Sequence, residues 1–291
     1  MDNHKKDKTN WKESNISNAF SYYDFLSFFL TSNIKEIINK TKNVIVSNNY
    51  FLDYSEDVYN SDKNVQEIVD VSYSLEHKLL EGRRKMDKLL KDRSSIFFNG
   101  ELYDMNTLIK NTHTLKLDSS IYSWLEEERI PTEDELNLAT YVIAERLLPK
   151  EEYKDIKKNR KDKLKEKLRN YLLEKGYFEE QDENDDVMLE KGTFSLSSPL
   201  FDLIIKPKTS KERSLPIFFD IRNGREYVSI IGKKIHDGEK IKKIEKKYKK
   251  HTTYILILSG FYSYETLRSL KFCNDWIWEN ELKSSLDMLN L

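Results

Sequence analysis

Three polar side chains stand at the ends of two short apolar runs, and their types are those of a metal-dependent site. Asp202 lies near the start of the first run, and Asp220 and Arg222 lie at the end of the second. Because side chains alternate across a strand, Asp220 and Arg222 point to one face and Ile221 to the other. Carboxylates on neighbouring strands repel each other, and a hard divalent cation relieves that repulsion. The pattern indicates a magnesium site, although solvent-facing charges at strand ends would give the same pattern.

The two runs predict a pair of neighbouring strands. Residues 201–205 and 215–221 are rich in β-branched and aromatic side chains, with the polar segment 206–214 between them, which is typical of strands joined by a loop. Further strands are predicted at 194–196, 227–231 and 253–258, with a basic helix at 233–250. A helix between two strands implies a right-handed crossover and a parallel pair, so the sheet should be mixed. The aromatic segment 276–278 is predicted to pack onto this sheet rather than to stack on bases.

The N-terminal half is predicted to be helical. Apolar residues recur at helical spacing over 16–46 and 65–91, as in helices with one buried face. Further helices are predicted at 102–110, 119–128, 132–148 and 151–175, and a loop at 48–64. Thr132 and Glu135 form a capping box at the start of the helix 132–148, and Gly176 is the expected C′ residue of the helix 151–175.

The predicted elements divide the chain into four parts. They are a disordered tail at 1–15, a mainly helical region at 16–178, an acidic linker at 179–190 and a core at 191–291. The linker carries seven acidic residues and no basic one, a composition that favours a solvated connection. The predicted fold class is α+β or α/β, with a helical N-terminal region followed by a mixed β-sheet core flanked by helices.

Composition excludes several classes of protein. The 291 residues suffice to bury a substantial core,. No stretch of about eighteen apolar residues and no signal-peptide pattern is present, so we expect a cytoplasmic protein. The single cysteine, Cys273, excludes an internal disulfide and a cysteine-based zinc site.

Positive charge gathers around the predicted site. The whole chain has a formal net charge of −1, but residues 203–251 contain fifteen Lys or Arg against six Asp or Glu. Binding of a phosphate backbone requires such a concentration of basic residues. A solvated, lysine-rich helix would show it as well.

Three blocks of sequence resemble the XamI-type family of type II restriction endonucleases. They span 130–177, 188–234 and 254–289, in the family's order and spacing, and the last contains its Asp-Trp-x-Trp-Glu segment at 275–279. The blocks cover about 160 C-terminal residues, and nothing specific precedes them. The family belongs to the PD-(D/E)xK nuclease superfamily. Its signature, an Asp followed by Asp/Glu-x-Lys, is similar to Asp202 and Asp220-Ile221-Arg222.

The resemblance implies an activity and partners. It implies Mg²⁺-dependent hydrolysis of phosphodiester bonds in double-stranded DNA at a specific sequence, by a restriction-endonuclease-like core. It also implies a homodimer, because a palindromic target is most simply bound by a two-fold symmetric protein. A cognate DNA methyltransferase would be the genetic partner.

The resemblance further implies roles for individual residues. Asp202, Asp220 and the Ile221 carbonyl would hold Mg²⁺. Asp162, three residues after Asn159 as in the family, would add an acidic ligand from a preceding helix, with Glu145 as the alternative. The predicted catalytic residues are Asp202, Asp220, Arg222 and Lys233, and the predicted DNA contacts are Asn159, Arg160, Arg225 and Lys234.

Arg222 departs from the family pattern, which has Lys at this position. A guanidinium stabilises negative charge but cannot exchange a proton near neutral pH. Lys233 or Lys234, which match a basic pair of the family, would then reach the phosphate instead. The alternatives are a catalytically weakened DNA-binding protein of the same fold and a non-catalytic interaction protein. In a nuclease the Asp202 and Asp220 carboxylates should approach within about 4–5 Å, the reach of a shared cation.

Overall fold

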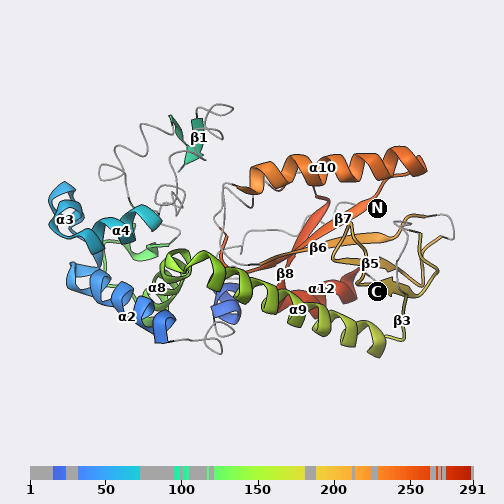
Figure 1. Ribbon diagram of the computed structural model, residues 1–291, viewed down its shortest axis with the longest axis horizontal. Helices are drawn as coiled ribbons and strands as arrows, with labels where there is room; N and C mark the ends of the chain where they lie inside the picture. The colour runs from blue at the N-terminus through green and yellow to red at the C-terminus, as the bar shows by residue number, and fades with distance from the viewer. Residues whose placement is uncertain are drawn as a thin grey trace.

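A helical group at one end of the molecule is joined to a β-sheet at the other by one long helix (Figure 1). The computed structural model describes residues 16–23, 32–72, 95–98, 101–104, 117, 121–180, 188–211, 214–223, 229–262, 267, 270 and 273–289. For residues 95–98, 101–104 and 229–237 it describes the backbone. All structural statements below refer to these residues.

The N-terminal helical group is built from short elements. Residues 16–23 are helical. They are followed by α2 (Ser32–Ser47), η2 (Asn49–Phe51), α3 (Glu56–Ser61), α4 (Lys63–Ser72), η4 (Ser123–Leu125) and α8 (Glu133–Leu147). A separate two-stranded hairpin is formed by β1 (Ser95–Phe98) and β2 (Glu101–Asp104), which are antiparallel. The capping box predicted at Thr132 and Glu135 is confirmed at the start of α8.

Several predictions for this half are wrong. The predicted loop 48–64 contains η2 and α3, because the Ser55 side chain accepts a 3.4 Å hydrogen bond from the Val58 amide and starts a helix there,. Strand β2 replaces the start of the predicted helix 102–110, where Asn99-Gly100 is a favoured hairpin-turn sequence,. In the predicted helix 119–128, the described residues 121–128 form the 3-10 helix η4 with turns on either side, and no α-helix. Helix α4 covers the start of the predicted helix 65–91, and residues 73–91 lie outside the described residues.

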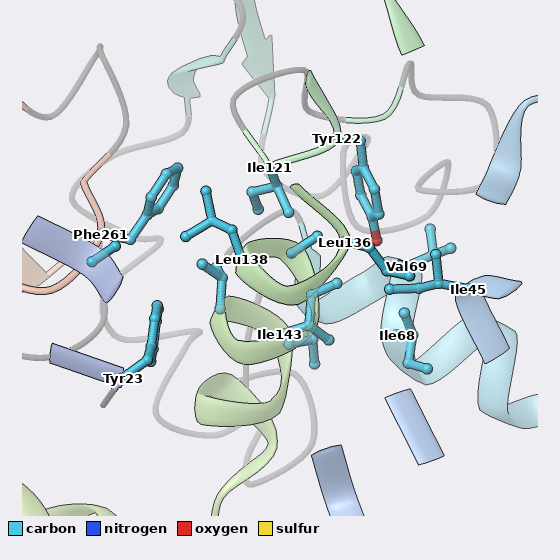
Figure 2. Close-up of a cluster of buried hydrophobic side chains, with 14 of the residues drawn as sticks. Tyr23, Ile45, Ile68, Val69, Ile121, Tyr122, Leu136, Leu138, Ile143 and Phe261 are labelled. Carbon is cyan, nitrogen blue, oxygen red and sulfur yellow. The ribbon is translucent and has the colours of Figure 1, made fainter. Parts of the chain in front are cut away.

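One hydrophobic core holds the helical group together. It contains Ile45 of α2, Ile68 of α4 and Ile143 of α8, which are labelled in Figure 2. Phe261, which follows the last long strand of the sheet, packs into the same core. Asn18 adds a polar tie, since its Nδ2 donates a 2.7 Å hydrogen bond to the Gly260 carbonyl. The helical group is therefore attached to the end of the sheet by apolar and polar contacts.

The C-terminal half contains a six-stranded mixed sheet, which confirms the predicted fold class. Its strands are β3 (Phe178–Glu179), β4 (Thr193–Ser195), β5 (Leu203–Lys206), β6 (Ile217–Asn223), β7 (Thr253–Ser259) and β8 (Asp275–Trp278), in this spatial order. The β4–β5 and β5–β6 pairs are antiparallel. The β3–β4, β6–β7 and β7–β8 pairs are parallel. Helix α10 (Ser229–Tyr248) connects β6 to β7 and makes their parallel pairing possible,.

Helices cover both faces of this sheet. Helices α9 (Lys150–Glu174) and α12 (Leu282–Met288) lie on one side and α10 on the other (Figure 1). Side chains alternate accordingly, so that Phe219 and Ile221 pack in the core that includes Leu164 of α9, whereas Phe218 packs in the core that includes Ile244 of α10,. Of these helices, α9 and α10 reach from opposite sides the point where β5 begins beside β6.

The predicted ends of these elements need two corrections and receive two confirmations. The backbone is helical at 229–231, so the strand predicted at 227–231 is wrong there and α10 begins earlier than residue 233. The segment 276–278 is buried as predicted, but it is itself part of the sheet, as strand β8, and does not pack onto it from outside. Helix α9 ends as predicted, with Gly176 at a φ of 73° and the Tyr177 amide bonded to the Leu172 carbonyl at 3.0 Å,.

Candidate active site

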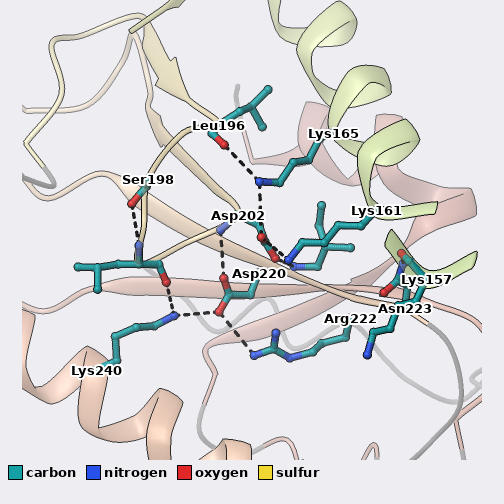
Figure 3. A network of polar contacts seen from close by, with 12 residues as sticks. Lys157, Lys161, Lys165, Leu196, Ser198, Asp202, Asp220, Arg222, Asn223 and Lys240 are labelled. Atoms are coloured by element: carbon teal, nitrogen blue, oxygen red, sulfur yellow. Dashed lines mark hydrogen bonds and ion pairs between the residues drawn. The ribbon is translucent and has the colours of Figure 1, made fainter. Parts of the chain in front are cut away.

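Asp202 and Asp220 lie opposite each other on neighbouring segments. The antiparallel register pairs Leu203 with Phe219, so the preceding residue, Asp202, faces Asp220 across the ladder,. The Asp202 amide donates a 3.1 Å hydrogen bond to Asp220 Oδ1, and the Ile221 amide donates a 2.9 Å bond to Asp202 Oδ2 (Figure 3). Asp202 is 9% exposed and Asp220 5%. The pair is therefore a buried acidic unit, and solvent-facing charges at strand ends do not describe it.

Basic side chains from two helices surround this pair. On the side of α9, Lys161 Nζ lies 2.5 Å and Lys165 Nζ 3.6 Å from Asp202 Oδ1. On the side of α10, Lys240 Nζ lies 3.0 Å from Asp220 Oδ2. Buried carboxylates are costly unless they are paired, and each aspartate has a lysine partner of its own.

Two further groups contact Asp220. The Arg222 guanidinium lies 3.5 Å from Oδ2, which agrees with the shared face expected for residues two apart in a strand,. The Tyr254 hydroxyl, from β7, donates a 2.7 Å hydrogen bond to the same oxygen. Oδ2 of Asp220 is thus the point on which Arg222, Lys240 and Tyr254 converge, and Oδ1 is bound by the main chain.

The donor atoms at this site suit a hard divalent cation. The Ile221 carbonyl points to the same edge of β6 as the Ile221 amide, which faces Asp202, because the amide and carbonyl of one strand residue share an edge,. No group of three or more His, Cys, Asp or Glu side chains gathers anywhere in the described part of the chain. Mg²⁺ needs only one or two carboxylates, since water and substrate phosphate complete its shell. Two aspartates and one carbonyl therefore fit Mg²⁺, whereas they are too few for an all-protein cage.

The two acidic residues predicted to assist the pair have different surroundings. Asp162 and Asn159 are exposed on α9, although the neighbouring Lys161 reaches Asp202. Glu145 is buried in the helical group, where it accepts hydrogen bonds from Tyr22 at 2.6 Å and Tyr23 at 3.4 Å. The metal role of Asp162 stays a prediction.

Arg160, a predicted DNA contact, has its guanidinium inside the protein. It forms an ion pair with Glu279, and its Nε lies 3.5 Å from Ser259 Oγ. The Ser259 hydroxyl donates to Glu279 in turn. This buried group ties α9 to the ends of β7 and β8, and a DNA contact of Arg160 stays a prediction.

The remaining predicted residues are Arg225, Lys233 and Lys234. Arg225 lies outside the described residues. Lys233 and Lys234 lie in α10, where the backbone alone is described at these positions. Their predicted roles therefore stay predictions.

The structure adds residues that were not singled out as site residues. Lys165, Lys240 and Tyr254 all contact the aspartate pair. A basic helix pattern cannot distinguish Lys240 from the other lysines of α10, because the contact depends on how the helix packs on the sheet. Tyr254 is the second residue of β7, and it pairs with Phe218, two residues before Asp220, so its hydroxyl reaches Asp220 along the same face of the sheet.

Comparison with known families gives the class of protein in which this buried acidic pair stands. Residues 88–278 match the family model of the XamI restriction endonuclease. The chain belongs to this family. Comparison with curated proteins and with solved structures finds no match.

The extent of the family match exceeds the blocks noticed in the sequence. It begins at residue 88, whereas the first of those blocks begins at residue 130, and it ends at residue 278, within the third block. Membership implies that the protein is a deoxyribonuclease that cuts DNA in type II restriction. Within the described residues, no helix is both long and apolar enough to cross a membrane.

Proposed function

We propose that this protein is a type II restriction endonuclease that cuts double-stranded DNA at a specific sequence and depends on Mg²⁺. The observation that carries the proposal is the buried Asp202–Asp220 pair, bound to each other through the main chain and faced by lysines from α9 and α10. In a chain of this family, that arrangement supplies oxygen ligands for a cation and positive charge for a phosphate in one place,.

Each residue of the site has a distinct proposed role. Asp202, Asp220 and the Ile221 carbonyl would hold Mg²⁺, which when bound polarises the scissile phosphate and lowers the pKa of a water molecule. Arg222 lies 3.5 Å from Asp220, so its guanidinium can bind phosphate oxygens through two parallel hydrogen bonds while it stays protonated. Lys161, whose side chain is 35% exposed, is paired with Asp202 and supplies a second positive charge beside the pair.

The proposed assembly follows from the type of target. A homodimer would place two copies of the Asp202–Asp220 pair on the two strands of a palindromic sequence. A cognate DNA methyltransferase would protect the host's own sites. The division of the chain into a helical region, an acidic linker and a sheet core is part of the same proposal.

Cleavage of plasmid DNA tests this function directly. The wild type is incubated with mixed plasmid DNA in Mg²⁺ and, separately, in EDTA, beside Asp202→Asn and the control Asp155→Asn. Asp155 is an exposed residue of α9, so its variant matches the chemical change away from the pair. We expect discrete fragments from the wild type and Asp155→Asn in Mg²⁺ only. For Asp202→Asn we expect a rate lower by at least about 10²-fold, because an amide is a poor ligand for Mg²⁺.

A second candidate function is supported by the presence of Arg where the family pattern has Lys. In that case the protein binds DNA without cutting it, because the guanidinium beside Asp220 cannot exchange a proton,. DNA binding that weakens steeply with salt, together with intact plasmid in Mg²⁺, would favour this candidate. A protein that neither binds nor cuts DNA would contradict both candidate functions.

A further inference from the structure

Lys240 places a lysine ammonium beside Asp220, where the Asp-x-Arg sequence itself supplies a guanidinium. Its Nζ lies 3.0 Å from Asp220 Oδ2, closer than the guanidinium of Arg222 at 3.5 Å. It reaches the carboxylate from α10, across the sheet face opposite α9, as Figure 3 shows. Lys240 follows Lys233, the lysine predicted from the sequence, by two turns of the same helix,.

The surroundings of Lys240 hold its ammonium in one position. The side chain is 11% exposed, and Nζ donates a 2.6 Å hydrogen bond to the Leu200 carbonyl as well as contacting Asp220. The Phe201 ring lies beneath it, with Nζ 4.0 Å from the ring centroid. Leu200 and Phe201 directly precede Asp202, so the segment that delivers the first aspartate also fixes the lysine that contacts the second.

This geometry leaves Lys240 one hydrogen-bond donor for a substrate. An ammonium group has three N–H donors, and the acceptors found for Lys240 among the described residues are the Leu200 carbonyl and Asp220. Lysine also differs from arginine in being a compact point charge with rotatable donors, which suits a small, moving group such as a water molecule. The third donor can therefore serve an oxygen that enters beside Asp220.

We propose that Lys240 is the catalytic lysine of this enzyme, and that the third donor of its ammonium binds the attacking water. The inference rests on the proposed function. Hydrolysis forms a bond from the water oxygen to phosphorus and breaks the bond from phosphorus to the 3′ oxygen, with a net transfer of one proton from that water to the 3′ oxygen. Lys240 orients the water and offsets the charge that develops on the phosphate, and Arg222 binds the phosphate without exchanging a proton.

Substitution of Lys240 tests this role against a merely structural one. Wild type, Lys240→Met, Lys240→Arg and the control Lys283→Met, an exposed lysine of α12, are compared in Mg²⁺. For Lys240→Met we expect cleavage slower by about 10²–10³-fold, with DNA affinity in EDTA within threefold of wild type. Lys240→Arg keeps a positive charge beside Asp220, so it should stay folded, yet it should cut at least tenfold more slowly.

Chemical restoration of the ammonium supplies a second readout. Lys240→Cys, made in a Cys273→Ser background, is alkylated with 2-bromoethylamine to give an aminoethyl side chain of nearly the length of lysine. We expect cleavage to return to at least a tenth of the rate of the Cys273→Ser protein treated in the same way. Thermal unfolding of each protein shows whether folding is retained.

The outcomes separate the two proposals. If the wild type cuts DNA and Lys240→Met or Lys240→Arg cuts at a rate within threefold of it, the role of Lys240 is overturned while the nuclease function stands. If the wild type does not cut any DNA in Mg²⁺, the proposed function fails, and the role of Lys240 fails with it.

Discussion

The Arg222 guanidinium lies 3.5 Å from Oδ2 of Asp220, on the face of β6 opposite to that of Ile221. The third residue of the Asp-x-Arg sequence is thus held beside its first residue by an ion pair. Tyr254 and Lys240 contact the same oxygen of Asp220, so this carboxylate keeps two partners when Arg222 is substituted. The contribution of Arg222 to cleavage can therefore be measured in variants that keep Lys240.

Substitution of Arg222 should reduce cleavage in proportion to the loss of charge. For Arg222→Met we expect a cleavage rate lower by about 10–10²-fold, because the phosphate loses a charged partner. Arg222→Lys should stay within about tenfold of wild type, because an ammonium retains the charge but not the two parallel hydrogen bonds. Single-turnover cleavage measures both, with Arg169→Met, an exposed position of α9, as the control. An Arg222→Met protein that cuts at the wild-type rate would exclude a role in phosphate binding.

The buried Arg160–Glu279 ion pair should contribute to stability. Removal of one partner leaves a buried charge uncompensated, and Glu279 is 4% exposed. We expect Arg160→Met to lower the free energy of unfolding by about 3–5 kcal/mol. The matched control is Arg169→Met, whose ion pair with Glu179 is on the surface and should be worth about 1 kcal/mol or less. Urea denaturation measures both values, and equal losses for the two variants would contradict the prediction.

Local signals explain which parts of the fold were predicted from the sequence. The capping box at Thr132 and the glycine at 176 define helix ends through contacts between near neighbours, and both were found as expected. The hairpin that carries Asp202 and Asp220 was likewise visible as two apolar runs around a polar loop. Strand β8 was missed because its four residues show no alternation, with buried side chains on both faces.

The lysine partners of the aspartates could not be predicted in the same way. Lys161 and Lys240, the partners of Asp202 and Asp220, come from two different helices that pack on opposite sides of the sheet. Each lies among several other lysines in a strongly basic helix, so only the packing of the helix selects it. The metal ligands and the DNA contacts stay predictions because cation and DNA are groups that the chain alone does not supply.

The pH dependence of stability should reveal the ion pair at the start of α8. Arg129 holds the pKa of Glu135 down from its usual 4.5 to about 2. A lowered pKa in the folded state stabilises the protein above about pH 4.5, and this contribution is lost as the pH falls towards 2. We expect Glu135→Gln, which keeps the capping hydrogen bonds, to lose about 1 kcal/mol at pH 7. That difference from wild type should shrink at pH 3.

Urea unfolding at pH 7, 5 and 3 measures the effect of Glu135. Glu133→Gln is the control, because Glu133 lies exposed in the same first turn of α8. A difference between wild type and Glu135→Gln that is as large at pH 3 as at pH 7 would rule out this titration.

Two glycines should respond in opposite directions to the same substitution. Gly176 has a φ of +73°, and an added Cβ would lie 3.1 Å from Lys208 Nζ, so Gly176→Ala should cost about 1–2 kcal/mol through the left-handed backbone. Gly238 lies within α10 and has no atom within 4 Å of an added Cβ. Gly238→Ala should therefore stabilise the protein by about 0.5–1 kcal/mol. Thermal unfolding distinguishes them, and a loss at both positions would refute the assignment for Gly238.

Helix α9 is a single rod of 25 residues with its two ends anchored in different interiors. Ile156 is buried in the core of the N-terminal helices, and Leu164 is buried in the core between α9 and the sheet. Lys161 lies between them in the sequence and contacts Asp202. Because the helix is continuous, we expect a displacement of its N-terminal part to move Lys161 relative to Asp202. Distant substitutions around Ile156 should consequently alter catalysis even where they spare every atom of the cluster.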